Sequence, residues 1–536
     1  MNIFISKDNE RRVILDNSND TIYDIMKVVP SAVWDRYYKY WSFGIEDWVW
    51  VRDKLNKLAI DYLCDNSVLE EALINYENWR THMIQTKDNE EYESLLNVNL
   101  YKHQKSAINF FINGGRLIFD EMRLGKSLVL LEYIEYLKQC NEIKNCLIIC
   151  PKNVIWVWVN ELKKFLSTDY NDYVTVFDFK NKSYDKSKSV FYTVVNYEYF
   201  RMNGELYRDR FDCVILDEGH KIRNRTSLIS KSIIDILVDV KYKLISTGTP
   251  FEKMEQLWAL LHFIMPISFN SYWKFQAKYC VVENKLLWGS KRHIKIITNY
   301  KNQEEFEKRI APLFIRRKKE DCFDLPTRVF QSLYVELDKE ERKVYTDLYN
   351  SFNTVEKEEK KRSLVRLLMS LSSLQALGIN SEKSSKIDSL NDFLNDLDLY
   401  NRKGKVIIWS SYIGTIKLLE KRLSQYKPAV LYGEVAKNID KIIDKFKNNN
   451  KCKLFIANPA VGGMGLDLCN ADVMIYLDCP ISYTDYLQSV ERNRGKQQTE
   501  SMLVIYMRVK GTVDDNIENS YANKQSLYEY LIDGGD

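Results

Sequence analysis

The segment from Asp120 to Ser127, Asp-Glu-Met-Arg-Leu-Gly-Lys-Ser, carries residue types that hold a phosphate group. A largely apolar run at 116–119 precedes it like a strand, and an apolar run at 128–134 follows it like the first turns of a helix. The main-chain N–H groups and the helix dipole at such a junction favour an anionic phosphate. Lys126 adds a cation for the outer phosphates, and the Ser127 hydroxyl can ligate Mg²⁺. The segment predicts the phosphate-binding loop of a nucleotide hydrolase, although Asp120 replaces the usual first glycine.

A pair of acidic residues ends another apolar run. Val214–Leu216 leads into Asp217-Glu218-Gly219-His220. The first carboxylate at such a strand end can hold Mg²⁺, and the second can orient and deprotonate an attacking water. Acidic residues also end strands simply to meet solvent. The pair therefore gains its significance from the phosphate loop in the same part of the chain.

The elements that must position these residues follow an α/β pattern. Short apolar strands alternate with amphipathic helices from about 93 to 265 and again after about 395, which is typical of parallel sheets. Between 265 and 395 the strand pattern stops and charged helical patterns replace it. We expect an α/β fold with two parallel-sheet lobes and helical insertions. The predicted strands are 146–150, 189–195, 213–216, 243–246, 406–409, 453–457, 473–477 and 502–506.

The composition of the 536 residues excludes several classes of protein. An apolar content of 45% and an aromatic content of 13% exclude a disordered chain. No run is apolar for long enough to cross a bilayer, and the N-terminus lacks the pattern of a signal peptide. We expect an intracellular protein, in the cytoplasm of a bacterium or infected host cell, or in a nucleus. Ten cysteines without a Cys-x-x-Cys pair favour reduced thiols over a metal site. A net charge of +4 leaves nucleic-acid binding to local basic surfaces.

Motifs along the chain carry a family resemblance. Asp217–His220 is a DExH box, and Tyr101–Gln104 resembles the glutamine motif that reads adenine. Cys150–Lys152, with Trp156 or Trp158, resembles a motif that touches the DNA backbone. Further matches lie at 246–250, 256–258, 314–319, 325–326, 462–468 and 488–497. From about residue 95 to 525, the chain resembles a Swi/Snf-type ATPase of helicase superfamily two.

This resemblance implies two RecA-like lobes that hydrolyse ATP between them, with Mg²⁺, and act on duplex or branched DNA. The residues that it implies for catalysis are Lys126, Asp217, Glu218, Arg492 and Arg494. The residues that it implies for nucleotide binding are Gln104, Arg123, Leu124, Gly125, Lys126, Ser127 and Gly465, with Ser127 and Asp217 holding Mg²⁺. The residues that it implies for coupling to DNA are Lys152, His220, Thr247, Gly248, Thr249 and Gln488.

Some positions depart from the family pattern or allow two interpretations. Arg123 stands where the family usually has glycine, and its side chain either faces the surface or leans on a phosphate or a carboxylate. Arg492 and Arg494 are two residues apart, whereas the family spaces its two arginines by three. We expect both to stabilise the transferring phosphoryl group. His220 either couples the lobes or is a satisfied polar residue, and the basic cluster at 316–319 either contacts phosphates or forms a solvated helix face.

The N-terminal region is expected to form a small accessory domain. Its segments at 26–30, 34, 38–41 and 45–48 resemble the HARP-type domain of annealing helicases. Its aromatic residues, interleaved with Arg36, Lys39 and Arg52, either engage DNA or fill a β/α core. The expected domains are 1–92, then 93–335 with a helical insertion from about 265, then 336–536 with a helical segment to about 395.

We therefore predict a DNA-stimulated ATPase that translocates on double-stranded DNA and remodels or reanneals branched DNA in repair or replication. Two alternatives stay open: a strand-separating helicase of the same superfamily, and a DNA-binding scaffold whose hydrolysis has decayed. Arg123 and the contracted arginine spacing favour the scaffold, whereas the joint presence of Lys126, Asp217 and Glu218 argues against it. The sequence indicates nucleic acid as a partner and identifies no protein partner and no membrane.

Overall fold

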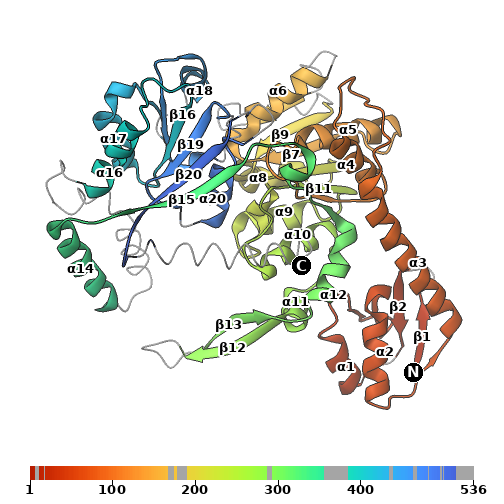
Figure 1. The fold of residues 1–536 in the computed structure, drawn as a ribbon. Helices are drawn as coiled ribbons and strands as arrows, with labels where there is room; N and C mark the ends of the chain where they lie inside the picture. The colour runs from red at the N-terminus through yellow and green to blue at the C-terminus, as the bar shows by residue number, and fades with distance from the viewer. Residues whose placement is uncertain are drawn as a thin grey trace. The chain divides into compact units, whose positions relative to one another are not determined.

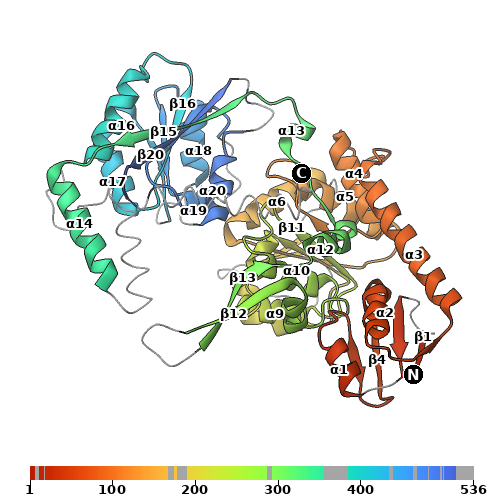
Figure 2. The same ribbon diagram turned by 60° about the horizontal axis from the view of Figure 1, so that its bottom comes forward.

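Two parallel sheets organise the chain (Figures 1 and 2). The computed structural model describes residues 1–6, 11–16, 19–166, 174–177, 190–286, 293–354, 384–433, 439–462, 468–480, 482–494, 498, 500–512 and 514. The chain divides into two compact units, of which the first contains Met1–Lys318 and the second begins at Lys319. Among the helices described, none combines the length and the apolar character needed to cross a bilayer.

The sheet of the first unit has the strand order β14-β6-β11-β10-β7-β9-β8, and each neighbouring pair is parallel. β7, β9 and β10 are buried along their whole length, as expected of strands that helices cover on both faces. The bounds are β6 (Leu117–Ile118), β7 (Cys146–Cys150), β8 (Val174–Phe177), β9 (Tyr192–Asn196), β10 (Cys213–Asp217), β11 (Tyr242–Ser246) and β14 (Phe314–Ile315). The strands predicted near these positions are confirmed, with ends that shift by a few residues.

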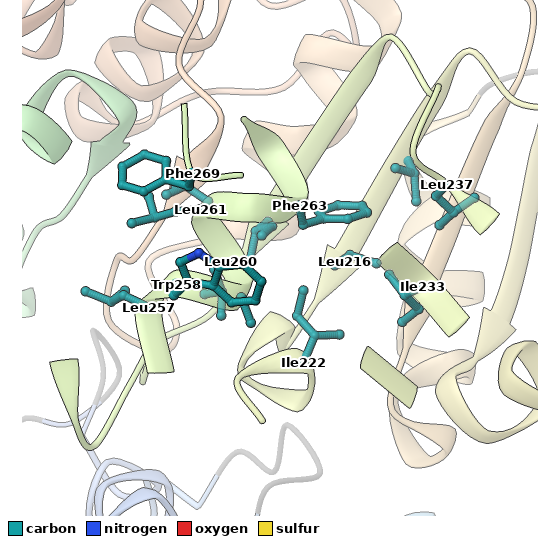
Figure 3. Close-up of a cluster of buried hydrophobic side chains, with 14 of the residues drawn as sticks. Leu216, Ile222, Ile233, Leu237, Leu257, Trp258, Leu260, Leu261, Phe263 and Phe269 are labelled. Atoms are coloured by element: carbon teal, nitrogen blue, oxygen red, sulfur yellow. The ribbon is translucent and has the colours of Figure 1, made fainter. Parts of the chain in front are cut away.

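Each face of this sheet has its own hydrophobic core, because successive strand residues point to opposite sides. Leu147 and Val214 pack with α8 (Tyr197–Asn203), α9 (Leu228–Ile236) and α10 (Leu257–Ile264). Ile148 and Ile215 pack with α4 (Lys102–Ile112), α5 (Lys126–Gln139) and α6 (Ile155–Phe165). Figure 3 shows the first core, where Leu216 of β10 lies among side chains of α9 and α10. Both helical layers therefore hold the strand whose end carries the acidic pair.

The expectation that strands stop between 265 and 395 is wrong. β12 (Cys280–Leu286) and β13 (His293–Tyr300) form an antiparallel hairpin. β14 adds to the edge of the first sheet, and β15 (Arg328–Val335) adds to the edge of the second. Most of β15 is exposed or half-buried, so its sequence lacks the continuous apolar run that marks a central strand.

The units divide after Lys318, ahead of the expected boundary at 335, because β15 pairs with the second sheet. The helices of this region are α11 (Tyr272–Tyr279), α12 (Gln303–Ile310), α13 (Lys319–Cys322), α14 (Lys339–Thr354) and α16 (Ser385–Asp396).

The sheet of the second unit has the order β15-β20-β19-β16-β18-β17 and is also parallel throughout. α16 and α17 pack on one of its cores, and α18 and α20 pack on the other. The remaining bounds are β16 (Lys405–Trp409), α17 (Ile413–Arg422), β17 (Ala429–Leu431), α18 (Ile439–Asn448), β18 (Leu454–Ala457), α19 (Pro459–Gly462), β19 (Ala471–Tyr476), α20 (Tyr483–Val490) and β20 (Met502–Val509). The four strands predicted here are confirmed.

The N-terminal residues form a five-stranded sheet of order β3-β4-β2-β1-β5 with its own core. Trp41 and Trp48 are buried in that core, whereas Tyr37 and Tyr38 are exposed. These two tryptophans therefore fill a β/α core, which was the second of the two interpretations for the aromatic residues of this region. The bounds are β1 (Asn2–Ile5), β2 (Arg12–Leu15), α1 (Asp20–Met26), β3 (Val33–Asp35), β4 (Tyr40–Gly44), α2 (Trp48–Lys57), β5 (Leu63–Cys64) and α3 (Asn66–Gln85).

A buried ionic cluster joins this N-terminal sheet to the rest of the first unit. The Asp47 carboxylate accepts hydrogen bonds from Arg309 Nη1 at 2.7 Å and from Lys278 Nζ at 3.0 Å. The Ser31 hydroxyl donates to its other oxygen at 2.5 Å. Burial alone would raise the pKa of Asp47, but Arg309 and Lys278 outweigh it and hold the pKa well below its ordinary value. The cluster fixes the N-terminal sheet through charge as well as apolar packing.

Candidate active site

The predicted phosphate loop connects β6 to the N-terminus of α5, as expected. Gly125 has φ +80° and caps α5. The positive φ favours glycine there, and a Cβ at Gly125 would lie 2.2 Å from Gln104 Nε2 and would force that side chain to move. Arg123 has φ +71°, a left-handed conformation that a side chain disfavours. The substitution of the usual glycine by Arg123 thus leaves strain in the loop.

Gln104 and His103, at the start of α4, both contact the phosphate loop. Gln104 Nε2 donates to the carbonyl oxygen of Leu124 at 3.2 Å, and His103 Nε2 lies 3.0 Å from the same oxygen. Gln104 also accepts from the main-chain N–H of Tyr101 at 3.0 Å, which closes the first turn of α4. The Gln104 amide is therefore held by the loop that it is expected to assist. His103 was not among the predicted site residues, although it lies within the glutamine motif.

Lys126 lies at the first position of α5 and is half-buried. Its Nζ donates to the carbonyl oxygens of Asp120 at 2.8 Å and Glu121 at 3.2 Å. Burial lowers the pKa of Lys126, although Glu218, Asp120 and Asp217 act in the opposite direction. The loop carbonyls thus hold the ammonium group at the helix N-terminus, near the acidic pair.

Asp217 ends β10, as predicted, and its carboxylate is buried. Trp158 Nε1 donates to Oδ2 at 2.8 Å, and the main-chain N–H of Glu218 donates to Oδ1 at 3.1 Å. Burial, followed by the charge of Glu218, raises the pKa of Asp217 to about 6. Trp158, Lys126 and Ser246 act in the opposite direction but do not offset the burial of two neighbouring carboxylates, which is the electrostatic setting that a divalent cation relieves.

Glu218 is joined to the end of the neighbouring strand. It adopts φ +51°, and its Oε2 lies 3.2 Å from Thr247 Oγ1 and 3.1 Å from His220 Nδ1. His220 Nδ1 in turn lies 3.1 Å from Thr247 Oγ1. The Thr247 hydroxyl also accepts the main-chain N–H of Thr249 at 3.1 Å. The structure therefore joins Glu218, expected for catalysis, to His220, Thr247 and Thr249, which were expected for coupling to DNA.

The loop after β11 also approaches the phosphate loop. A Cβ at Gly248 would lie 3.4 Å from Met122 Cγ and 3.7 Å from the carbonyl oxygen of Asp120. Gly248 therefore lies next to the phosphate loop, at a distance where a Cβ would make ordinary van der Waals contact. Lys152 lies after β7 in a 3-10 turn, Lys152–Val154, and is exposed. Among the DNA-coupling residues predicted in the first unit, Lys152 is the most exposed.

Two arginines of the basic cluster support the phosphate loop. Arg317 pairs with the buried Asp120 carboxylate through Nη2 at 2.9 Å and Nε at 3.3 Å. Arg316 Nη2 lies 3.4 Å from Glu121 Oε1. The sequence predicted that residues 316–319 contact phosphates or form a solvated helix face. In the structure, Arg316 and Arg317 instead pair with the loop acids Glu121 and Asp120. Asp120, an acid at a loop position that usually lacks one, indicates that the loop needs a cationic partner, but the sequence does not identify Arg317 as that partner.

The second unit contains the remaining predicted residues. Gln488 lies in α20 and is buried, and Arg492 follows the helix with 3% of its side chain exposed. The main-chain N–H of Leu468 donates to the Arg492 carbonyl at 3.1 Å. Arg494 Nη2 donates to Glu320 Oε1 at 2.5 Å. Gly465 lies outside the described residues.

A buried ionic group flanks these arginines within the second unit. Lys319 Nζ lies 2.5 Å from Glu491 Oε2 and donates to the Arg494 carbonyl at 3.0 Å, and Arg328 Nη1 lies 2.9 Å from Glu491 Oε1. Burial would raise the pKa of Glu491, but Lys319 and Arg328 hold it well below its ordinary value. Lys319 is therefore buried as well, unlike either interpretation of the basic cluster.

Comparison with known proteins gives two family matches. A model described as the SNF2-related domain matches residues 39–382, and the helicase conserved C-terminal domain matches 385–494. The chain belongs to the SNF2-related family. The SNF2-related match begins within β3–β4 of the N-terminal sheet, upstream of the expected start near 95.

Several curated relatives are similar to this chain. An uncharacterised ATP-dependent helicase of Mycoplasma genitalium is 24% identical over 458 residues, which are 81% of this chain and 42% of the relative. The human DNA repair and recombination protein RAD54B is 24% identical over 511 residues, 81% of this chain and 55% of the relative. The chain thus spans about half the length of these relatives or less. The solved SWI2/SNF2 ATPase core of Sulfolobus solfataricus in complex with double-stranded DNA is 25% identical, with coverage of 84% and 96% and a TM-score of 0.41.

Asp217 and Ser127 of the first unit have the chemistry to contribute part of the ligand set of a Mg²⁺ ion. No group of three or more His, Cys, Asp or Glu residues that could hold a metal lies within the described parts of this SNF2-related chain. Mg²⁺ commonly takes one or two carboxylates and completes its coordination with substrate phosphates and water. Asp217, with Ser127 on the first turn of α5, matches such a partial set.

Proposed function

We propose that this chain is an ATP-dependent translocase on double-stranded DNA that remodels or reanneals branched DNA. The observation that carries the proposal is the contact of Thr247 with both Glu218 and His220. This contact ties the carboxylate expected to activate water to the loop expected to respond to DNA. The name of the human relative refers to DNA repair and recombination, which supports a role on branched DNA.

Each predicted residue has a place in the proposed reaction. Gln104 selects adenine, while the main chain at Gly125 and the Lys126 ammonium bind the phosphates. Ser127 and Asp217 hold Mg²⁺, which would neutralise phosphate charge. Glu218 takes a proton from water as phosphoryl transfer begins. Arg492, Arg494 and Gly465 keep the roles that the family resemblance implies.

The exposed surface beside α6 supports DNA binding by the first unit. Trp156 has 58% of its side chain exposed, and Lys152 lies just before the helix. An exposed indole beside a cation suits contact with a nucleic-acid strand, because the ring stacks or packs while the ammonium meets phosphate. Trp158 is buried. Of the two tryptophans, we therefore assign Trp156 to DNA.

ATP hydrolysis by the wild type and by Lys126→Ala tests the proposal, each without nucleic acid and with single-stranded, duplex and forked DNA. Lys138→Ala is the matched control, because Lys138 lies in the last turn of the same helix, away from the phosphate loop, where it pairs with Glu135 and lies over the ring of Phe191. We expect duplex and forked DNA to stimulate the wild type and Lys138→Ala but not Lys126→Ala. Displacement of a third strand from a DNA triplex then reports translocation.

The outcomes separate the rival functions. Triplex displacement with annealing of forked DNA, and without release of a strand from a partial duplex, supports the translocase. Release of that strand would establish the strand-separating helicase. Equal and low hydrolysis under every condition would favour the scaffold. The strained Arg123 and the contracted arginine spacing are the observations that motivate this alternative.

A further inference from the structure

Helix α6 has two tryptophans with opposite environments. Trp156 is exposed, whereas only 1% of Trp158 is exposed. The two residues are two positions apart, so a helix of 3.6 residues per turn directs them to nearly opposite sides. Trp158 faces the sheet core that contains Ile148 and Ile215. One short helix therefore has an outer aromatic surface and an inner aromatic contact.

The inner contact reaches the acidic pair. α6 follows β7, which pairs with β10 so that Ile149 lies beside Leu216. This register brings the indole over the end of β10, where Trp158 Nε1 donates to Asp217 Oδ2 at 2.8 Å. An indole has a single donor, and in this protein that donor is used entirely on Asp217.

Both oxygens of the Asp217 carboxylate are therefore fixed. The main-chain N–H of Glu218 donates to Oδ1, while Trp158 donates to Oδ2. Two donors at different oxygens determine the plane of the carboxylate and leave further lone pairs on each oxygen for another ligand. Hydrogen bonds to a ligating carboxylate orient it for the metal, and their loss weakens metal binding.

We propose that Trp158 is a positioning residue that orients the Asp217 carboxylate for Mg²⁺ and thereby links α6 to the nucleotide site. The inference rests on the proposed ATPase function. Trp158 contacts neither nucleotide nor water in this role and acts through Asp217. Because Trp156 and Trp158 share one helix, a shift of α6 on contact with DNA moves the donor that orients Asp217.

Nucleotide binding as a function of Mg²⁺ concentration tests the inference without requiring hydrolysis. The probe is a fluorescent N-methylanthraniloyl ATP, excited directly, with full-length protein and no DNA. Trp158→Phe removes the N–H donor and keeps an aromatic ring. Replacement of Trp158 by 3-benzothienylalanine, in which sulfur replaces the N–H, keeps the bicyclic shape and covers the case in which the phenylalanine variant unfolds.

We expect both replacements to raise the Mg²⁺ concentration for half-maximal nucleotide binding by about tenfold or more, the usual effect of losing such support. Nucleotide binding without Mg²⁺ should stay unchanged. Trp273→Phe, the same change at an exposed tryptophan of α11, should leave the Mg²⁺ requirement at the wild-type value. A merely structural role of Trp158 would alter thermal stability without changing the Mg²⁺ requirement.

The failures of the two proposals are distinguishable. Wild-type Mg²⁺ dependence in a folded benzothienyl variant would overturn the role of Trp158 and leave the ATPase proposal intact. A wild type that binds no nucleotide at any Mg²⁺ concentration would overturn the ATPase proposal and this inference with it.

Discussion

The Thr247 hydroxyl lies 3.1 Å from Nδ1 of His220. The two residues follow adjacent parallel strands, β11 and β10, which pair in register with Asp217 beside Ser246. The same hydroxyl reaches Glu218 Oε2. Parallel pairing places the ends of both strands at one edge of the sheet, so a change in the loop after β11 reaches Glu218 through a single oxygen atom.

Replacing Thr247 by Val should uncouple hydrolysis from DNA. The substitution keeps the shape of the side chain and removes the oxygen that contacts Glu218 and His220. We expect basal ATP hydrolysis to persist while stimulation by duplex DNA falls about tenfold, which corresponds to losing one hydrogen bond of roughly 1.4 kcal/mol. Steady-state hydrolysis with and without duplex DNA measures this change.

Thr86→Val is the matched control for that experiment. The Thr86 hydroxyl is buried and donates to the Met83 carbonyl at 2.7 Å, so the same change removes a hydrogen bond at a residue with no expected part in coupling to DNA. Its removal should leave stimulation by duplex DNA nearly unchanged. Equal effects of the two substitutions on stimulation would contradict the role assigned to the Thr247 hydroxyl.

Gly125→Ala should impair nucleotide binding more than it impairs folding. The added Cβ meets Gln104 Nε2 and displaces it from the Leu124 carbonyl, in addition to the strain of φ +80°. Gly114→Ala has a comparable strain, at φ +113°, but its Cβ would lie no closer than 4.0 Å to Met83 Sδ. We expect each variant to lose about 1 kcal/mol of stability. Only Gly125→Ala should lose affinity for ATP, as measured by nucleotide titration, and equal affinities would disprove the steric role of Gly125.

Arg317→Lys should loosen the phosphate loop. An ammonium group cannot replace the two-point contact of the guanidinium with Asp120 while also reaching Ser106 Oγ, which Arg317 contacts at 2.7 Å. We expect a loss of about 2 kcal/mol in the free energy of unfolding. Arg208→Lys makes the same chemical change at a half-buried arginine that pairs with the exposed carboxylates of Glu205 and Asp235, and it should change stability little. Denaturant unfolding measures the change in unfolding free energy of both variants, and equal changes would contradict the role assigned to Arg317.

Asp47→Asn should destabilise the first unit strongly. The change leaves Arg309 and Lys278 buried without their shared carboxylate, which costs about 3 kcal/mol or more. Asp24→Asn, at an exposed ion pair with Lys27, should have little effect. A small effect at Asp47 would show that the cluster does not hold the N-terminal sheet.

The effect of Asp47 should also depend on pH, with a definite sign. Its pKa in the folded protein is lower than the ordinary 3.8, so the folded state favours the charged form. Its contribution to stability is therefore complete well above pH 3.8 and is lost as the pH falls below about 4. The difference in unfolding free energy between wild type and Asp47→Asn should be constant from about pH 8 to 5 and shrink below about 4. A difference that grows in acid would contradict this assignment.

Central strands could be predicted from the sequence because they are buried on both faces. Cys146–Cys150 and Cys213–Asp217 are uninterrupted apolar runs apart from the functional acid that ends the second. The phosphate loop and acidic pair were found for the same reason, since each directly follows such a run. β15 and the β12–β13 hairpin were missed because exposed strands mix polar and apolar residues and give no clear period.

Long-range side-chain pairs could not be predicted in this way. Nothing local in the sequence indicates that Arg317 meets Asp120, or that Arg309 meets Asp47, because the chain must fold before each pair forms. Trp158 was noted as an alternative to Trp156 in a motif that touches the DNA backbone, and its contact with Asp217 depends on the register of β7 against β10. Local patterns identify individual groups, whereas the sheet determines which groups become neighbours.

The short strand β14 gives the phosphate loop a mechanical connection. The main-chain N–H of Phe119 donates to the Ile315 carbonyl, and that of Glu121 donates to the Arg317 carbonyl at 3.1 Å. The chain passes from the first unit to the second one residue later, after Lys318. Tension on the chain at this point would therefore reach the backbone of the loop that is expected to bind the ATP phosphates.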